Sequence, residues 1–137
     1  MSTLSQNIRL AHVALIVPRV DAAAQAVGRL LGRAPADRDV LADEGVRIAF
    51  VDVGGARIEL MEPLDAGGAL GRFLAARGAG IHHLAFVVPD ITAALARARA
   101  AGLRLVDEDP RPGAGGTRVA FLHPSGTHGV LVELVEE

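Results

Sequence analysis

Two histidines and two glutamates carry the chemistry that this sequence can offer. His12 lies in the apolar run 9–17, and His83 lies in a similar run at 81–88. Glu59 and Glu133 each occupy an Ile/Val-Glu-Leu motif in a later apolar segment. Taken singly, such residues are more commonly a hydrogen-bonded core histidine or a solvent-facing glutamate. Together, two imidazoles and two carboxylates make a ligand set for a divalent ion such as Co²⁺, Ni²⁺, Mn²⁺ or Zn²⁺.

The spacing of these four residues follows an internal repeat. The offset of 71 residues between the two histidines also aligns the segment 47–50 with 118–121. The two glutamates lie 74 residues apart, because the second hairpin turn is three residues longer. Repetition at a nearly fixed offset predicts two copies of one structural unit. A pseudo-twofold axis between the copies would bring the four side chains to one metal site, with open water positions for catalysis.

Each copy is predicted to fold as β-α-β-β-β. The elements expected in the first copy are a strand over 9–17, a helix over 21–31 with Gly32 as its C-cap, a strand edge and loop over 33–45, and hairpin strands over 46–53 and 57–61. Those expected in the second copy are a strand over 81–88, a helix over 91–101, a strand over 103–106, a loop over 107–116, and strands over 117–122 and 130–135. The sequence therefore predicts an α+β fold, in which the units 8–62 and 80–135 are joined by a linker helix at 66–77 to form a single domain at 8–135 with a shared metal-binding cleft.

Alternation of side chains along the first strand predicts where that cleft lies. His12 and Ala14 point to one face of the strand, and Leu15 and Val17 point to the other. The face with large apolar side chains suits packing on the helix of the unit. The small alanine beside the histidine leaves room for a ligand on the opposite face, and the second copy repeats this arrangement.

Composition narrows the chemistry and the partners. The chain has 137 residues, of which half are hydrophobic, and a formal net charge of −2 without a block of like charges. Neither nucleic acid nor a membrane surface is therefore an expected partner. The sequence contains no Cys, Trp, Tyr or Lys, which excludes thiol nucleophiles, Schiff bases and phenolic acids. Because no basic region precedes an apolar run at the N-terminus, we expect a cytoplasmic protein.

Four motifs carry a resemblance to a known family. They are Gly-Ile-His-His-Leu-Ala-Phe at 80–86, Asp-Glu-Asp-Pro-Arg-Pro-Gly at 107–113, Phe-Leu-His-Pro at 121–124 and Gly-Val-Leu-Val-Glu-Leu at 129–134. With these motifs and its paired units, the chain resembles the vicinal oxygen chelate superfamily, whose fold is glyoxalase-like. Within that superfamily it is most similar to the methylmalonyl-CoA epimerase family. The resemblance covers about Ile8 to Glu133.

The resemblance implies a metal-dependent isomerase that interconverts (R)- and (S)-methylmalonyl-CoA by removing and returning the α-proton through a metal-stabilised enolate. Glu133 matches a metal ligand of the family that also serves as one base. Some members of the family carry the second base at the position aligned with Ile48, and a Gln at the position aligned with Glu59. Since Ile48 cannot carry a proton, we expect Glu59 to be the second base, with His12, Glu59, His83 and Glu133 as metal ligands.

Further residues are candidates for contacts with the substrate. They are Phe50, Phe121 and His123 on the predicted cleft face, and Gly115 and Gly116 in a loop that could close over the pantetheine arm of CoA. For His123 a plain turn role is equally open.

The alternatives to an epimerase are a glyoxalase I-type lactoylglutathione lyase, which has two symmetric glutamates, and a metal-free small-molecule binding protein of the same fold. Retention of all four candidate ligands argues against the metal-free protein. The resemblance also implies a CoA thioester substrate and a homodimer.

Overall fold

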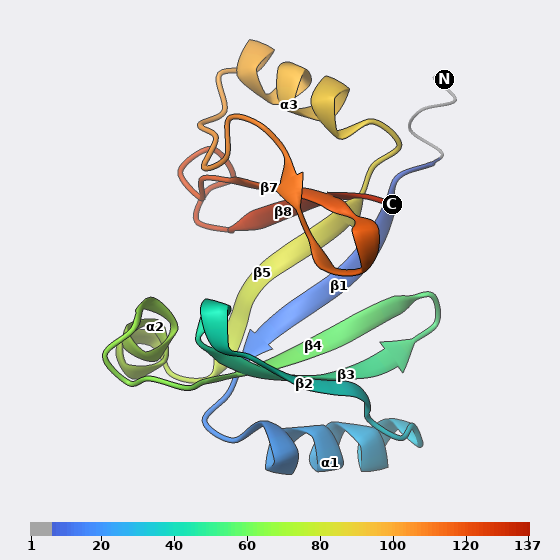
Figure 1. Ribbon diagram of the computed structural model, residues 1–137, viewed down its shortest axis with the longest axis vertical. Helices are drawn as coiled ribbons and strands as arrows, with labels where there is room; N and C mark the ends of the chain where they lie inside the picture. Colours follow the sequence, from blue (N-terminus) through green and yellow to red (C-terminus); the bar gives the residue numbers. More distant parts are fainter. Residues whose placement is uncertain (1–6) are drawn as a thin grey trace. The chain divides into compact units, whose positions relative to one another are not determined.

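The computed structural model describes residues 7–137, which divide into two compact units (Figure 1). One unit consists of residues 12–82. The other consists of residues 83–137 together with residues 7–11. In both units, parallel and antiparallel strand pairs occur together. The predicted α+β class with two β-α-β-β-β units is confirmed, whereas the boundaries of a single domain at 8–135 remain a prediction.

The elements of the first repeat follow the predicted order closely. They are β1 (Arg9–Ile16), α1 (Val20–Leu31), β2 (Ala36–Leu41), the short 3₁₀ helix η2 (Ala42–Glu44), β3 (Val46–Val53) and β4 (Ala56–Pro63), followed by the linking helix α2 (Ala69–Arg77). Gly32 adopts the left-handed conformation with φ 66°, and its N–H donates to the Gly28 carbonyl. This is the predicted C-cap, a position where glycine avoids the steric cost that a Cβ would bring.

The second repeat contains β5 (Gly80–Val87), α3 (Ile91–Ala100), β6 (Arg111–Pro112), the 3₁₀ helix η3 (Ala114–Gly116), β7 (Arg118–Leu122) and β8 (Val132–Glu136). The prediction of a strand over 103–106 is wrong. Two backbone hydrogen bonds, from the His123 N–H to the Arg104 carbonyl at 2.8 Å and from the Val106 N–H to the Phe121 carbonyl at 2.9 Å, surround a single isolated bridge between Leu105 and Leu122. The reason lies in Asp107, whose carboxylate accepts the Phe121 N–H at 2.8 Å. The Asp107 side chain thereby occupies a backbone N–H that a longer strand ladder would have used. The strand that follows α3 forms further along the chain, at β6.

The strand order is β2-β3-β4-β1 in the first unit and β5-β8-β7-β6 in the second, and the strand register repeats between the units. In the parallel pair β1–β4, Ala14 lies opposite Glu59, and in the parallel pair β5–β8, Ala85 lies opposite Glu133. Both alanines are fully buried. This correspondence places each glutamate at the same point of its unit, as the repeat predicts.

Two apolar clusters cover the two faces of the strands in the first unit. On the helix side, Val17 packs with Val20 and Ala24 of α1 and with Leu60 of β4. The opposite face carries a separate cluster. Its members are Ala14, Val46, Ile48 and Met61. The predicted division between a helix face and a second face is therefore confirmed for this unit.

Glutamates at the ends of the last strands hold the helix N-termini. The N–H of Val20, the first residue of α1, donates to Glu62 Oε1 at 2.8 Å, and the N–H of Ile91, the first residue of α3, donates to Glu136 Oε2 at 2.9 Å. A carboxylate here satisfies an otherwise unpaired amide and interacts favourably with the helix dipole. In α3 the Asp90 side chain adds a second cap, whereas the N-cap residue of α1 makes no such bond.

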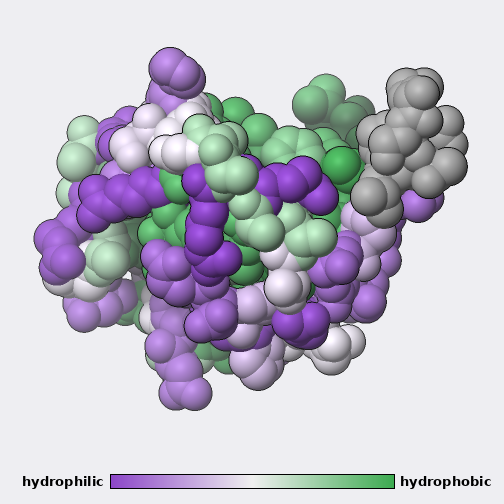
Figure 2. Space-filling model, turned by 90° about the horizontal axis from the view of Figure 1, so that it is seen from above, coloured by the Kyte–Doolittle hydropathy of each residue, from purple (hydrophilic) through white to green (hydrophobic). Residues whose placement is uncertain are grey.

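Hydrophilic residues are spread over the face drawn in Figure 2, with hydrophobic residues visible between them. Some large apolar side chains of the molecule are exposed, among them Leu30, Ile81 and Val106. No helix among residues 7–137 is long and apolar enough to cross a membrane.

Candidate functional site

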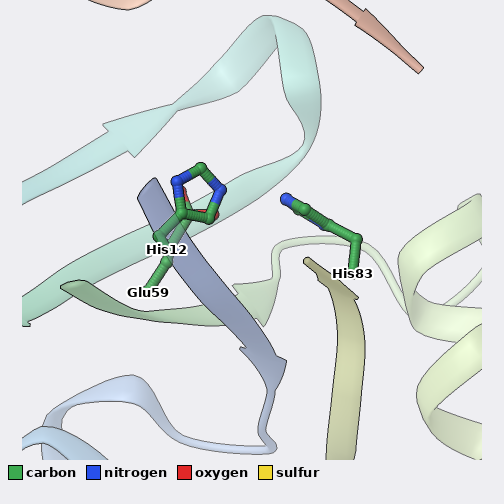
Figure 3. Close-up of side chains that lie close together, drawn as sticks. All are labelled: His12, Glu59 and His83. Carbon is green, nitrogen blue, oxygen red and sulfur yellow. The ribbon is translucent and has the colours of Figure 1, made fainter. Parts of the chain in front are cut away.

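The first His–Glu pair lies on the sheet face opposite α1. His12 projects from the middle of β1 and Glu59 from β4, and Figure 3 shows the two side chains together. His12 Nε2 lies 3.5 Å from Glu59 Oε1, and the side chains are 17% and 14% exposed. Because Ala14 stands opposite Glu59 without bulk, the carboxylate and the ring can approach each other above the sheet.

The second pair repeats this geometry on the other unit. His83 of β5 and Glu133 of β8 approach to 3.2 Å between Nε2 and Oε1, with side-chain exposures of 7% and 12%. The Phe121 ring meets the His83 ring edge-on, with centroids 5.4 Å apart. Phe121 is also the cross-strand partner of Glu133 on β7. Ring and carboxylate therefore restrict the His83 side chain from two sides.

The chemistry of each pair suits a divalent ion. An imidazole nitrogen and a carboxylate oxygen that bind one ion at about 2.0–2.2 Å each lie about 3 Å apart when they are neighbouring ligands. The observed separations of 3.5 Å and 3.2 Å are close to that value. His12, Glu59 and His83 are residue types able to hold such an ion, and Glu133 adds a second carboxylate of the same kind. The donor set therefore fits a divalent metal, without identifying which one.

Phe50 is held on the site face of the first unit by charged neighbours. It is the cross-strand partner of Glu59, and the Arg57 guanidinium lies 4.0 Å from its ring centroid. Arg57 Nε lies 2.7 Å from Asp52, and Asp37 binds the same guanidinium. Partial burial acts to lower the Arg57 pKa, but the hydrogen bonds and charges of the two aspartates outweigh it and raise the pKa. Arg57 therefore stays charged and stacks on Phe50 as a cation.

The remaining sequence candidates lie outside the strands of the second unit, His123 after β7 and the two glycines in η3. His123 follows β7, and its Nδ1 accepts the Ser125 N–H at 3.0 Å and lies 2.9 Å from the Ser125 hydroxyl. Gly115 and Gly116 have φ of 66° and 80°, and a Cβ at either would meet no neighbour within 4 Å. Backbone conformation, not crowding, is thus the local reason for these glycines. Whether any of the three touches a substrate stays a prediction.

Sequence reasoning missed the arginines beside the two phenylalanines. Arg57 lies over Phe50 and Arg111 lies over Phe121, although the two arginines do not correspond in the repeat. The offset that identified the histidines therefore gives no signal for them. Arg111 does occur in the motif at 107–113. A charged residue held between two prolines was the sequence feature that could have marked it as a candidate.

Comparison with known proteins identifies the family. A family model described as the Glyoxalase/Bleomycin resistance protein/Dioxygenase superfamily matches residues 11–121. The chain belongs to this superfamily. The predicted membership of the glyoxalase-like vicinal oxygen chelate superfamily is thereby confirmed.

Several members of the superfamily are similar over nearly the whole chain. An ethylmalonyl-CoA/methylmalonyl-CoA epimerase of Cereibacter sphaeroides is 42% identical over 131 residues, covering 92% of this chain and 96% of the relative. The mitochondrial methylmalonyl-CoA epimerase of Homo sapiens is 37% identical over 127 residues, covering 92% and 72%. A solved methylmalonyl-CoA epimerase in complex with methylmalonyl-CoA and NH4+ has a TM-score of 0.85 and 34% identity, with 94% of each chain covered. The predicted resemblance to the methylmalonyl-CoA epimerases is confirmed.

Proposed function

We propose that this protein is a metal-dependent epimerase that interconverts (R)- and (S)-methylmalonyl-CoA. The observation that carries the proposal is the matched placement of the two His–Glu pairs. In each unit the glutamate lies opposite a buried alanine of the neighbouring strand. That alanine follows the histidine of the same strand by two residues. Similarity to proteins named as epimerases of this substrate supports the choice of reaction.

In this proposal the two pairs contribute to one divalent-ion site, with His12, Glu59, His83 and Glu133 as its ligands. When bound, such an ion would supply Lewis acidity, which would lower the energy of the enolate. The imidazoles would bind as neutral nitrogen donors, and the carboxylates would offset the charge of the ion. The metal itself is left open among Co²⁺, Ni²⁺, Mn²⁺ and Zn²⁺.

The two glutamates then divide the proton transfers. Glu133 removes the C2 proton, and the electron pair of the broken C–H bond passes into the thioester carbonyl to give a planar enolate. Glu59, in its acid form, returns a proton to C2 on the opposite face. Exchange with solvent resets both carboxyl groups before the next turnover. Inversion therefore requires one proton carrier on each face, and Ile48 cannot be one of them.

Side chains around the pairs would shape the rest of the binding site. Phe50 and Phe121 offer apolar rings beside the two glutamates, which suits the acyl group and thioester. Gly115 and Gly116 lie exposed at the end of η3, from where they could follow the pantetheine arm, and His123 could donate a hydrogen bond through Nε2. We further propose that the protein works as a homodimer in the cytoplasm.

A glyoxalase-type lyase is the second candidate, because a glutamate at position 59 gives each unit the same ligand pair. The two candidates are separated by incubating the metal-loaded protein with methylmalonyl-CoA in one reaction, and with methylglyoxal and glutathione in another. The epimerase proposal expects one methylmalonyl-CoA epimer to yield the other, and no lactoylglutathione. Formation of lactoylglutathione without epimer conversion would replace it with the lyase. A protein that catalyses neither reaction and holds no ion would support the binding-protein alternative.

A further inference from the structure

An arginine lies one aromatic ring away from the His83–Glu133 pair. The Arg111 guanidinium lies 5.6 Å from the centroid of the Phe121 ring. The same ring meets His83 edge-on at 5.4 Å, and Phe121 is the strand partner of Glu133. All four residues belong to the unit that contains 83–137. A cation therefore lies over the ring that packs against His83, without belonging to the ligand set.

The backbone around Arg111 is fixed in place. Arg111 and Pro112 form β6, in which Arg111 pairs with Val119 of β7. Prolines on both sides, at 110 and 112, restrict φ and reduce the conformational freedom that binding would otherwise remove. A rigid strand edge thus presents the guanidinium.

Asp107 holds the guanidinium and the ring together. Its Oδ1 lies 3.4 Å from Arg111 Nε, and its Oδ2 accepts the Phe121 N–H at 2.8 Å. The Asp107 side chain is only 20% exposed. The carboxylate is engaged by Nε, so it does not use the donors on the two Nη groups of Arg111.

Arg111 has fewer acidic partners than Arg57 and is more exposed. Arg57 is bound by two aspartates, and its side chain is 32% exposed. Arg111 has a single acidic partner within ion-pair distance among residues 7–137, and its side chain is 51% exposed. The charge of Arg57 is more than neutralised by its neighbours, whereas Arg111 keeps donors that match the two oxygens of a carboxylate or phosphate.

We propose that Arg111 binds an oxyanion of the substrate and so makes the protein selective for acyl-CoA thioesters that carry that anion. The inference rests on the proposed function, since it takes the substrate to be methylmalonyl-CoA. Two anions of this substrate have the required chemistry, the free carboxylate of the acyl group and the phosphates of CoA. Arg111 acts in binding, and the proton transfers remain with the glutamates.

The test compares Arg111→Gln and Arg111→Lys with the wild type in the metal-loaded, full-length protein. We expect Arg111→Gln to raise KM and the Kd for methylmalonyl-CoA about 10- to 100-fold, the loss expected for a charge-assisted hydrogen bond, with a much smaller change in kcat. Arg111→Lys restores charge without the planar fork and should recover part of the affinity. Arg104→Gln is the matched control, because it removes one positive charge from an exposed position of the same unit and should leave KM unchanged.

Two truncated ligands distinguish the source of the anion. Propionyl-CoA lacks the acyl carboxylate, and methylmalonyl-pantetheine lacks the CoA phosphates. If Arg111 binds the carboxylate, the variant should bind propionyl-CoA as the wild type does and lose affinity for methylmalonyl-pantetheine; phosphate binding predicts the reverse. A wild type that epimerises while Arg111→Gln keeps its Kd for all three ligands overturns the inference but not the epimerase. If the wild type binds methylmalonyl-CoA without epimerising it, and Arg111→Gln weakens that binding, the proposed function is overturned and the inference is supported. A wild type that binds none of the ligands overturns both.

Discussion

Replacing Glu59 by Gln should separate metal binding from inversion at C2. The carboxylate lies 3.5 Å from His12 Nε2 and is 14% exposed, on a strand paired on both sides. Gln has nearly the same size and keeps a carbonyl oxygen for a metal ion, but it cannot accept a proton from C2. The substitution therefore leaves the ligand count intact and removes one of the two proposed bases.

The expected magnitudes place the effect in catalysis and not in folding. Loss of a general base typically lowers the rate about 10²- to 10⁴-fold, which corresponds to about 3–5 kcal/mol of transition-state stabilisation. Exchanging the charged acceptor beside His12 for a neutral one should change the free energy of unfolding by about 1 kcal/mol. A folded, metal-loaded variant with a rate reduced by two to four orders of magnitude is therefore expected.

Each epimer of methylmalonyl-CoA is incubated separately in deuterated water, and both deuterium at C2 and the configuration are followed. With Glu133 still present, the variant should exchange the proton of one epimer with solvent yet fail to invert it. Glu62→Gln is the control, because Glu62 lies three residues further along β4 and holds the Val20 N–H, away from the site face. Full epimerisation by metal-loaded Glu59→Gln would refute the assignment of the second base, and equal loss in the control would point to a general effect of the charge change.

Three further predictions concern the metal, the helix caps and the assembly. His83→Ala should lower the bound divalent ion, measured by elemental analysis, to well below one per chain while the circular dichroism stays that of the wild type; unchanged metal content would contradict the ligand set. Glu62→Ala should lower the free energy of unfolding by about 1–2 kcal/mol in urea, and Glu136→Ala by less, because Asp90 still caps α3. The reverse order would mean that these carboxylates are not the main caps. Light scattering at micromolar concentration should give the mass of a dimer, and a monomer would count against the proposed assembly.

Much of the fold could be predicted because the repeat and the local signals agree. The alternation around His12 and Ala14 identified the faces of β1, and Gly32 marked the end of α1. The prediction of a strand at 103–106 is wrong because the Asp107 side chain accepts the Phe121 N–H, which a longer ladder would have used. Hydrophobic periodicity does not reveal such a side-chain hydrogen bond. Leu103 and Leu105 still pack against the core. Their hydrophobic pattern therefore predicts the burial of these side chains, but not the backbone hydrogen bonding of the segment.

The site could be predicted only in its repeated part. The two histidines and two glutamates recur at related positions, and each pair does come together in its own unit. The helix caps join residues 42 and 45 positions apart, so no local capping pattern marks them in the sequence. Arg57 and Arg111 reach their phenylalanines from positions that the repeat does not relate, and only the fold brings these charges to the rings.

The proposed reaction is removal and return of the C2 proton of methylmalonyl-CoA with the help of a bound divalent ion. The most direct measurement is proton NMR of (R)-methylmalonyl-CoA in deuterated water, with the protein first stripped of metal by a chelator and then reloaded with Co²⁺. The reloaded protein should incorporate deuterium at C2 while the substrate approaches a mixture of both epimers, and the stripped protein should do so far more slowly. Epimerisation at full rate after the metal has been removed, or no C2 exchange by the reloaded protein, would contradict the proposed reaction.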